Sequence, residues 1–576
     1  MNELRVWAPR ARTGVEAVSL SGAKVALRAA TDGWFTGEIP FDDYHLSIDG
    51  SDPRPDPRSG WQPAGVDGPT RVVDHDAFEW TDSSWRGAPL SAAVIYELHI
   101  GTFTTGGTFD AAIAKLDHLV ALGVTAIELM PVAEFSGDRG WGYDGVDLFA
   151  PHHAYGGPDG LKRLIDACHA RALAVIVDVV YNHLGPSGNY LREFGPYFTN
   201  SYGTPWGEAI NFDDRGSTEV RRFVIDNALG WLENYHADGL RLDAVHAIYD
   251  KSAIHILEEL ASREDELEAR LGRELWLIAE NDLNDPRIVR SREAGGYGID
   301  AQWSDDLHHA LHARLTGETT GYYADFGTIA DITTALRQAF VYDGKYSPFR
   351  DRVHGRPTTG LAGDRFLGYL QTHDQVGNRA RGERTSALMS AGLLKVGAAL
   401  VLTSPFVPML FQGEEWGATT PFLYFTDHAD AELGRAVREG RRREFTAFGW
   451  APEDIPDPQD PATFEHSKLD WSELDDPVHA DLFDWHRSLI RLRREIPALS
   501  DGRMDQVKTR YDEAAGWLVV ERGNVTIACN FSERSVSIPI DEGRTGELLL
   551  TSTKDPVRQD AKVNLLPSSV SIWKNG

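Results

Sequence analysis

The chain has 576 residues and a net charge of −30, and 42% of its residues are hydrophobic while 25% are charged. This composition is that of a globular protein and excludes long disordered tracts, and the length implies about two to four domains. Because the chain is strongly acidic, we expect no nucleic acid and no anionic membrane among its partners, whereas an uncharged substrate is compatible with it.

Cysteine usage and the absence of a visible targeting segment bear on the compartment. Cys168 and Cys529 lie far apart without metal-ligand spacing, and we predict two buried free thiols. The first residues carry no basic segment followed by an apolar one, and no apolar run is long enough to span a bilayer. The expectation is a cytoplasmic protein.

Residues 1–90 are predicted to form a β-sandwich module. Residues 15–20 and 24–28 partly alternate apolar and polar side chains, which is the period of a half-buried strand. The proline-rich residues 52–60 cannot continue a strand or a helix, so they are predicted to form a surface loop or the start of a linker.

Residues 91–500 are predicted to form a (β/α)8 TIM barrel, an α/β fold in which parallel strands alternate with helices. The predicted strands occupy residues 94–100, 124–130, 173–180, 239–243, 275–280, 299–303, 366–371 and 408–411. Predicted helices include residues 109–122, 160–172 and 481–494, where apolar side chains recur at helical spacing. Insertions are expected at about 184–215 and 414–475, and residues 501–576 are predicted to form an antiparallel β domain.

Four segments of this barrel carry acidic or histidine residues at the end of an apolar run. They are residues 178–183, 239–246, 277–282 and 371–375. Burying a carboxylate is costly unless the strand end opens into a polar site, and barrel enzymes place their chemistry at the carboxyl ends of their strands. The best-placed carboxylates are Asp243, Glu280 and Asp374.

Asp243 and Glu280 end the fourth and fifth strands, which are neighbours, so the two carboxylates can face one bond from opposite sides. Glycoside cleavage needs such a pair, with a nucleophile and an acid that protonates the leaving oxygen. Arg241 lies two residues before Asp243 on the same strand face, where a guanidinium would orient it. One aspartate at a strand end is more often a helix cap, but three carboxylates together with Arg241 favour catalysis.

These four segments resemble the four motif regions of the α-amylase clan of retaining glycosidases, in order and spacing, over about residues 90–500. The resemblance implies that Asp243 is the nucleophile, Glu280 the acid/base and Asp374 the stabiliser that grips substrate hydroxyls. For a retaining enzyme the two working carboxyl groups are expected about 5–5.5 Å apart. The N-terminal module is similar to the starch-binding-like module of isoamylases and branching enzymes.

The same resemblance implies a glucose site on the non-reducing side of the cleaved bond. Its predicted residues are Arg241, His183, His373 and the stacking aromatic Tyr143. Trp141 is either part of this site or a plain core aromatic. Asp178 and Asn182 stand where some relatives hold calcium, but we expect them to brace the site through hydrogen bonds, with Asp178 close to the catalytic centre. No metal and no cofactor are expected.

Within the clan, the chain is similar to the maltooligosyltrehalose trehalohydrolases. The similarity lies in residues 242–248, 279–285, 373–379, 413–416 and 421–428. Many α-amylases carry a Lys-His pair after the nucleophile, whereas this chain has His246 and then alanine, so its leaving-side subsite is expected to differ. Asn281 and Asp282, just after Glu280, are further candidates for that side.

The resemblance implies hydrolysis of the α-1,4 bond next to the terminal trehalose unit of maltooligosyltrehalose, which releases trehalose and a maltooligosaccharide. Other α-glucans are expected ligands, and the enzyme would work after a maltooligosyltrehalose synthase. Two alternatives stay open at this point. One is a glycogen branching or isoamylase-type debranching enzyme with the same catalytic residues, and the other is an inactive amylase-like protein that only binds glucan.

Overall fold

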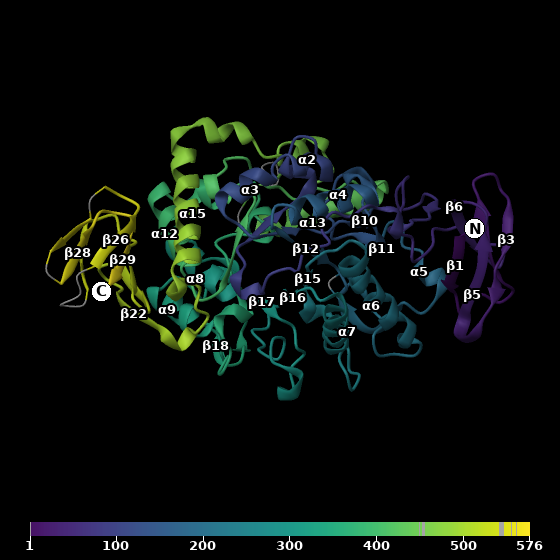
Figure 1. The fold of residues 1–576 in the computed structure, drawn as a ribbon, viewed down its shortest axis with the longest axis horizontal. Coiled ribbons are helices and arrows are strands. Elements are labelled where there is room, and N and C mark those ends of the chain that lie inside the picture. Colours follow the sequence, from purple (N-terminus) through teal and green to yellow (C-terminus); the bar gives the residue numbers. More distant parts are fainter. Residues whose placement is uncertain are drawn as a thin grey trace.

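Eight parallel strands close into a barrel at the centre of the molecule in the computed structural model (Figure 1). In chain order they are β8 (Ile95–Leu98), β9 (Ala126–Leu129), β12 (Ala174–Val179), β15 (Gly239–Leu242), β16 (Trp276–Ala279), β17 (Ala301–Trp303), β20 (Phe366–Gly368) and β21 (Val407–Phe411). The last strand pairs with the first, with Leu410 opposite Tyr96, and this pairing closes the barrel. All eight predicted strands are therefore confirmed, in the predicted order.

The structure describes residues 2–204, 206–447, 450–451, 455–540, 546–554, 556–559 and 561–575. Small parts of the predicted regions lie outside the described residues: residue 1 of the N-terminal module and residue 205 of the first insertion, residues 448–449 and 452–454 of the second insertion, and residues 541–545, 555, 560 and 576 of the C-terminal domain.

Helices cover the outside of the barrel because both faces of a parallel sheet must be buried. Strand β12 is an apolar run broken only by Asp178, and all six of its residues are buried. The larger covering helices are α4 (Gly157–His169), α6 (Ser217–Asn234), α7 (Ile256–Leu271), α8 (Asp305–Thr316), α9 (Ile329–Gln338), α12 (Ala391–Leu402) and α15 (Pro477–Glu495).

The helix predicted over residues 109–122 is broken in the structure. Residues Phe109–Ile113 form α2 and Leu116–Leu122 form α3, while Lys115 between them has φ −107° and ψ −3°, which is still right-handed but far from ideal helical values. The break leaves Phe109 and Leu116 fully buried, so core packing overrides the uninterrupted helical pattern of the sequence.

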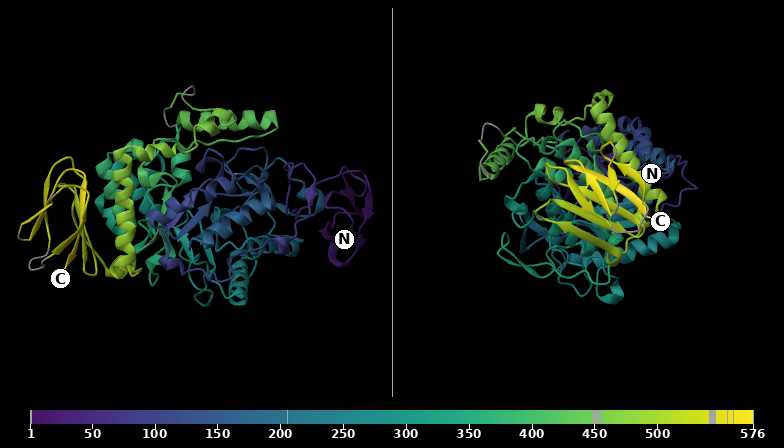
Figure 2. Two further views of the ribbon diagram at one scale, coloured as in Figure 1. Left: turned by 45° about the horizontal axis from the view of Figure 1, so that its top comes forward. Right: turned by 90° about the vertical axis from the view of Figure 1, so that its left-hand side faces the viewer.

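Antiparallel sheets lie at the two ends of the molecule, with the barrel between them (Figures 1 and 2). The N-terminal sheets have the strand orders β1–β5–β4 and β3–β2–β6–β7. Their strands are β1 (Asn2–Trp7), β2 (Val15–Ser19), β3 (Lys24–Ala26), β4 (Arg28–Ala29), β5 (Trp34–Ile39), β6 (Asp43–Ile48) and β7 (Thr70–Arg71). Residues 52–60 contain no regular strand, as predicted, and Asp56 is buried against the Tyr44 hydroxyl at 2.9 Å.

The C-terminal sheets have the orders β22–β23–β24–β29–β26 and β25–β28–β27, as expected for an antiparallel β region. Their strands are β22 (Val507–Asp512), β23 (Trp517–Arg522), β24 (Val525–Asn530), β25 (Val536–Pro539), β26 (Gly546–Thr551), β27 (Val557–Gln559), β28 (Lys562–Leu565) and β29 (Ser569–Asn575). Cys168 and Cys529 are buried free thiols, as predicted. Among the described helices, none has the length and apolar character needed to cross a membrane.

The two predicted insertions contain secondary structure of their own. The first holds α5 (Leu191–Phe194) and the hairpin β13 (Phe198–Thr204) and β14 (Gly207–Ile210). The second holds η9 (Glu414–Trp416), α13 (Ala431–Ala447), α14 (Pro461–Glu465) and η11 (Trp471–Asp475). A further hairpin, β10 (Ala133–Phe135) with β11 (Gly145–Pro151), carries the loop that contains Tyr143.

Candidate active site

Strands β15 and β16 place Asp243 and Glu280 side by side. The strands are paired in register up to Leu242 and Ala279, so the next residue of each lies at the same rim of the barrel. Directly after Asp243, Ala244 adopts a left-handed conformation with φ 41° and ψ 51°. Such a conformation is unfavourable for a residue with a Cβ and is typical of functional turns. Here it lets the Ala244 N–H donate to Glu280 Oε2 at 2.8 Å.

One guanidinium joins these two carboxylates. Arg241 is fully buried, and its Nη1 donates to Asp243 Oδ1 at 2.8 Å, while its Nη2 lies 2.9 Å from Glu280 Oε2. The Asn182 amide donates to the other Asp243 oxygen, Oδ2, at 2.6 Å. Asp243 is therefore held by a donor on each oxygen, which fixes its orientation and stabilises its negative charge.

Asp178 forms the third contact of this guanidinium. Its Oδ2 accepts from Arg241 Nη1 and from the Tyr143 hydroxyl, both at 2.7 Å. Burial raises the pKa of Asp178 to about 7, and the charge of Arg241 opposes that rise while the charge of Asp243 adds to it. Asp178 consequently titrates near neutral pH beneath the site.

His373 continues the network on the far side of Tyr143. Its Nε2 lies 2.8 Å from the Tyr143 hydroxyl, and its Nδ1 lies 2.5 Å from Oε1 of Glu97, which is buried on β8. Burial alone would lower the pKa of His373, but the charges of Glu97 and Asp374 outweigh it and raise that pKa to about 9. His373 is thus a cationic donor at neutral pH.

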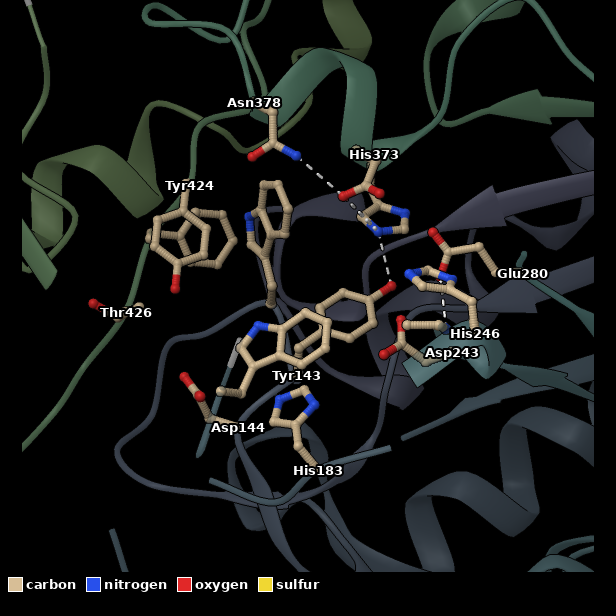
Figure 3. Close-up of a pocket in the computed structure, with 15 residues that line it drawn as sticks. Tyr143, Asp144, His183, Asp243, His246, Glu280, His373, Asn378, Tyr424 and Thr426 are labelled. Atoms are coloured by element: carbon tan, nitrogen blue, oxygen red, sulfur yellow. Dashed lines mark hydrogen bonds and ion pairs between the residues drawn. The ribbon is translucent and has the colours of Figure 1, made fainter. Parts of the chain in front are cut away.

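These residues line one cavity of about 400 Å³ at the carboxyl ends of the strands (Figure 3). Asp243, His246 and Glu280 lie toward one end of it, and Tyr424 and Thr426 toward the other. The predicted residues that line it are Trp141, Tyr143, His183, Asp243, His246, Glu280, His373 and Asp374. Arg241 and Asp178 lie beneath the cavity and act through their contacts to it.

Two aromatic side chains give the cavity flat surfaces. Trp206, half exposed in the first insertion, stacks on the His183 ring with centroids 4.6 Å apart and planes at 14°. Burial lowers the pKa of His183, which favours its neutral form. Trp141 lines the cavity, but it is also 6% exposed and donates to the Leu423 carbonyl at 2.9 Å, so it belongs to both the core and the site.

Asn281 and Asp282 do not line this cavity. The Asn281 side chain is buried and donates to Gln302 Oε1 at 3.2 Å, which turns it away from the cavity. Asp282 lines a second cavity of about 350 Å³, where it pairs with Arg350 at 2.9 Å. The two cavities share Glu280, Asp374 and Asn378, so they meet at the candidate acid.

Several residues of the site were not predicted from the sequence. Glu97 lies inside the predicted first strand and had no neighbour in sequence that suggested a partner, although a buried acidic residue in an apolar strand is itself a signal. Other unpredicted lining residues of the first cavity are Asp144, Ala244, Asn378, Tyr424, Phe425 and Thr426. Asn378 donates to Asp374 Oδ1 at 3.2 Å, one helical turn along the chain.

Comparison with known proteins places this site among glycosidases. The family described as "Alpha amylase, catalytic domain" matches residues 69–203, and the family described as "Domain of unknown function (DUF3459)" matches residues 502–572. The chain is 52% identical to a "Malto-oligosyltrehalose trehalohydrolase" of Arthrobacter ramosus, over 93% of each chain. It is 45% identical to the protein of that name from Saccharolobus solfataricus, over 95% of this chain and 93% of that one.

A solved structure and a further sequence relative bear on the same question. A crystal structure titled as a putative alpha amylase from Salmonella typhimurium superposes with a TM-score of 0.90 at 39% identity, and the match covers 100% of this chain and 97% of that one. A "1,4-alpha-glucan branching enzyme GlgB" of Pseudoalteromonas atlantica is 32% identical over only 42% of this chain and 38% of its own length. Full-length similarity therefore favours the trehalohydrolases over the branching enzymes that the sequence analysis left open.

Proposed function

The chain belongs to the malto-oligosyltrehalose trehalohydrolase family, and from this premise we propose that it hydrolyses the α-1,4-glucosidic bond next to the terminal trehalose unit of maltooligosyltrehalose. The products are trehalose and a maltooligosaccharide with retained α configuration. The observation that carries the proposal is the Arg241 guanidinium, which contacts Asp243 and Glu280 at the rim of one cavity. That arrangement provides a nucleophile and an acid on one bond.

In the first step Asp243 attacks the anomeric carbon of the glucose bound over Tyr143 and His183. Its orientation is set by Arg241 and Asn182, which hold one carboxylate oxygen each. A fixed carboxylate loses little freedom on reaching the transition state, and this preorganisation lowers the activation free energy of the first displacement. A covalent glycosyl-enzyme forms as the bond to the leaving oxygen breaks.

Glu280 donates the proton that the leaving oxygen needs. Its Oε2 accepts the Ala244 N–H and lies 2.9 Å from Arg241 Nη2, which leaves Oε1, without a hydrogen-bond partner among the described residues, as the oxygen that donates. After trehalose leaves, water attacks the anomeric carbon from the side that trehalose vacated while the Glu280 carboxylate takes its proton, and the bond between that carbon and Asp243 breaks. Two displacements at one carbon retain its configuration.

The second cavity accommodates the leaving group. It begins at Glu280 and Asp374 and continues past Tyr322, Phe349 and the Asp282–Arg350 pair. Trehalose is bent at an oxygen that joins two anomeric carbons, so its second glucose lies off the axis of a maltose chain. Aromatic faces and one fixed charged pair there supply stacking and paired hydrogen bonds for that second ring.

The substrate itself must come from an enzyme that converts the reducing end of a maltooligosaccharide into a trehalose unit. A maltooligosyltrehalose synthase catalyses that conversion, so this chain would act directly after it in the reaction sequence. The uncharged substrate accords with the net charge of −30.

Product analysis on maltopentaose and maltotriosyltrehalose at equal concentration tests the proposal. We expect rapid release of free trehalose from the second substrate and little attack on the first. Equal cleavage of both, or new branch points on amylose without trehalose, would overturn the assignment to maltooligosyltrehalose. The Glu280→Gln variant is the control, because its loss of activity attributes any trehalose to this site rather than to a contaminant.

A further inference from the structure

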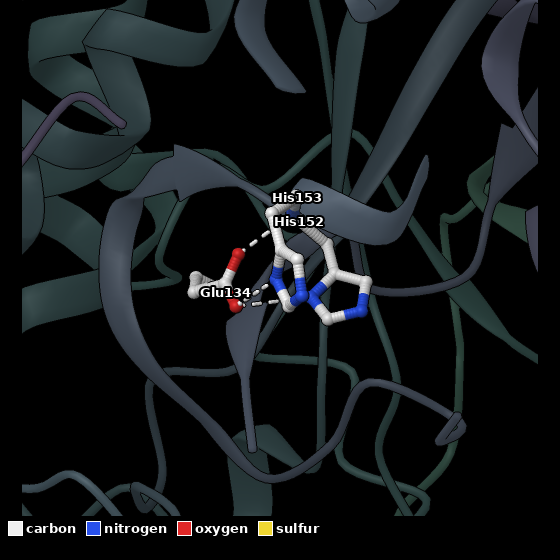
Figure 4. A group of neighbouring side chains, drawn as sticks. All are labelled: Glu134, His152 and His153. Carbon is white, nitrogen blue, oxygen red and sulfur yellow. Dashed lines mark hydrogen bonds and ion pairs between the residues drawn. The ribbon is translucent and has the colours of Figure 1, made fainter. Parts of the chain in front are cut away.

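A group of side chains of the types that bind metals lies outside the catalytic cavity, at one end of the hairpin formed by β10 and β11 (Figure 4). Glu134 belongs to β10, and His152 and His153 directly follow β11. The hairpin brings them together, because the His152 N–H donates to the carbonyl of Val132 at 2.8 Å. One ligand atom from each of the three lies within 4.8 Å of the others.

We propose that Glu134, His152 and His153 bind one zinc ion, with water as the remaining ligand. Glu134 Oε1 is 2.7 Å from His153 Nδ1 and 3.3 Å from His152 Nδ1. Zinc bonds of about 2.0–2.1 Å in tetrahedral geometry place neighbouring ligand atoms roughly 3.3 Å apart. One of these separations already has that value, and the other needs to open by about half an ångström, a movement that side-chain rotation supplies.

The burial of the His152 ring is not explained by an ion pair alone. The side chain is fully buried, and among the described residues neither ring nitrogen makes a hydrogen bond; Nδ1 has only the 3.3 Å ion-pair contact with Glu134 Oε1. A buried polar group without a partner costs free energy, about 1–3 kcal/mol in general. A metal ion at Nδ1 would satisfy the nitrogen that faces Glu134.

The surroundings supply the support that metal-bound histidines usually have. His153 directs its Nε2 to Asp138 Oδ1 at 3.1 Å, which is the carboxylate–histidine pairing found behind zinc ligands. The His152 ring stacks on Phe135 with centroids 3.8 Å apart and planes at 16°, so its orientation is fixed. The Glu134 carboxylate is itself oriented by the His153 N–H at 2.8 Å.

The donor set favours zinc over calcium or magnesium. Two imidazoles and one carboxylate suit a borderline ion, whereas calcium and magnesium prefer six or more oxygen ligands. The pair Asp178 and Asn182, considered for calcium in the sequence analysis, lies elsewhere and is occupied by hydrogen bonds. The His153 side chain is 22% exposed, so water can reach the ion.

Zinc here would stabilise the hairpin rather than take part in the reaction. The hairpin carries the loop with Trp141 and Tyr143, and this loop is tied back at the Gly140 carbonyl by His99 Nε2 at 2.9 Å. Closing the base of the hairpin with a metal would therefore limit the motion of Tyr143. This inference does not depend on the identity of the substrate.

The test is metal titration of the full chain after removal of metals with a chelator. We expect zinc sulfate to bind at one equivalent by calorimetry and to raise the midpoint of thermal unfolding. Cobalt(II) chloride should give the visible absorption of a tetrahedral site at the same stoichiometry. The Glu134→Gln and His153→Asn variants should lose this equivalent, and Asp138→Asn should weaken zinc binding by about 10- to 100-fold.

Controls separate this site from adventitious binding. His466 is exposed and belongs to no such group in the described part of the chain, so His466→Ala should bind zinc as the parent does. Asp138 has a side chain that is 70% exposed, so its variant folds even if the buried substitutions do not. An absence of any saturable equivalent in the parent chain, or an equivalent that survives Glu134→Gln and His153→Asn, would overturn the proposal.

Discussion

Arg241→Gln is the substitution that tests the proposed site most directly. The side chain is fully buried and is the cation that Asp178, Asp243 and Glu280 share. A hydrogen bond to a charged group contributes about 1.5–3 kcal/mol. Loss of the bond to Asp243 alone should lower kcat/KM by about 10- to 100-fold, since each 1.36 kcal/mol is tenfold in rate.

The contact with Glu280 extends this estimate. If the 2.9 Å ion pair to Glu280 stabilises the transition state by a similar amount, the combined decrease in kcat/KM is about 10²- to 10⁴-fold. Stability should fall as well, because removing one partner of a buried ion pair costs about 3–5 kcal/mol. The pKa of Asp178 is about 7, so below that pH it takes up a proton, and the loss of stability should be smaller there.

The assay compares kcat/KM for trehalose release and the thermal midpoint with those of Arg493→Gln. Arg493 is also a buried arginine, but within the described part of the chain it donates only to backbone carbonyls, among them those of Ser404 at 2.8 Å and Phe406 at 2.6 Å. Its variant should lose stability and keep its kcat/KM at a temperature where it stays folded. If both variants lose stability while both keep full kcat/KM, Arg241 has only a structural role and the reasoning is refuted.

Three further substitutions separate acid catalysis, charge and stacking. Glu280→Gln should lower kcat by about 10²–10⁴-fold with little change in KM, as measured by trehalose release, and full turnover would contradict its role as acid. Glu97→Gln should lower the pKa of His373 from about 9. His373 stabilises the fold below its unfolded pKa of about 6.5 and loses that contribution as pH rises through about 9, so the alkaline fall in stability and in kcat/KM should move to lower pH in this variant. An unchanged pH profile would show that Glu97 does not raise the pKa of His373. Trp206→Ala removes a cavity-lining ring that stacks on His183. Stacking of the bound sugar on this ring at about 0.5–1.5 kcal/mol predicts that KM rises about two- to tenfold at nearly constant kcat, and an unchanged KM would place the sugar elsewhere.

The strand ends were predictable because their signal is local. An apolar run that ends in Asp243 or Glu280 can be recognised from consecutive residues. In a parallel barrel, the order of such runs along the chain also predicts which strands are neighbours. The relation of Arg241 to Asp243 was likewise predictable, because residues two apart on a strand face the same side. The observed bond of 2.8 Å agrees with that shared face.

Glu97 and Asn281 show where a sequence is insufficient. Glu97 contacts His373, which lies 276 positions away in sequence, and no feature of either segment indicates that the two residues pair. Asn281 directly follows Glu280, yet its side chain turns into the protein toward Gln302, because successive residues at a strand end alternate in direction. Proximity in sequence therefore predicts which residues lie at the carboxyl end of the barrel, whereas the direction of each side chain is known only from the structure.

The charges beneath the site determine how the two working carboxylates divide their tasks. Glu128, buried in the barrel, has no hydrogen-bond partner on either oxygen among the described residues, and burial raises its pKa well above the usual value, which favours its neutral form. Burial also raises the pKa of Asp178, to about 7, which reduces the competition of Asp178 with Asp243 and Glu280 for the Arg241 charge near neutral pH. When Glu280 gives its proton to the leaving oxygen, the negative charge that appears is met at once by Nη2, 2.9 Å away. The same guanidinium therefore supports the nucleophile before attack and the spent acid after it, which is what a double displacement requires.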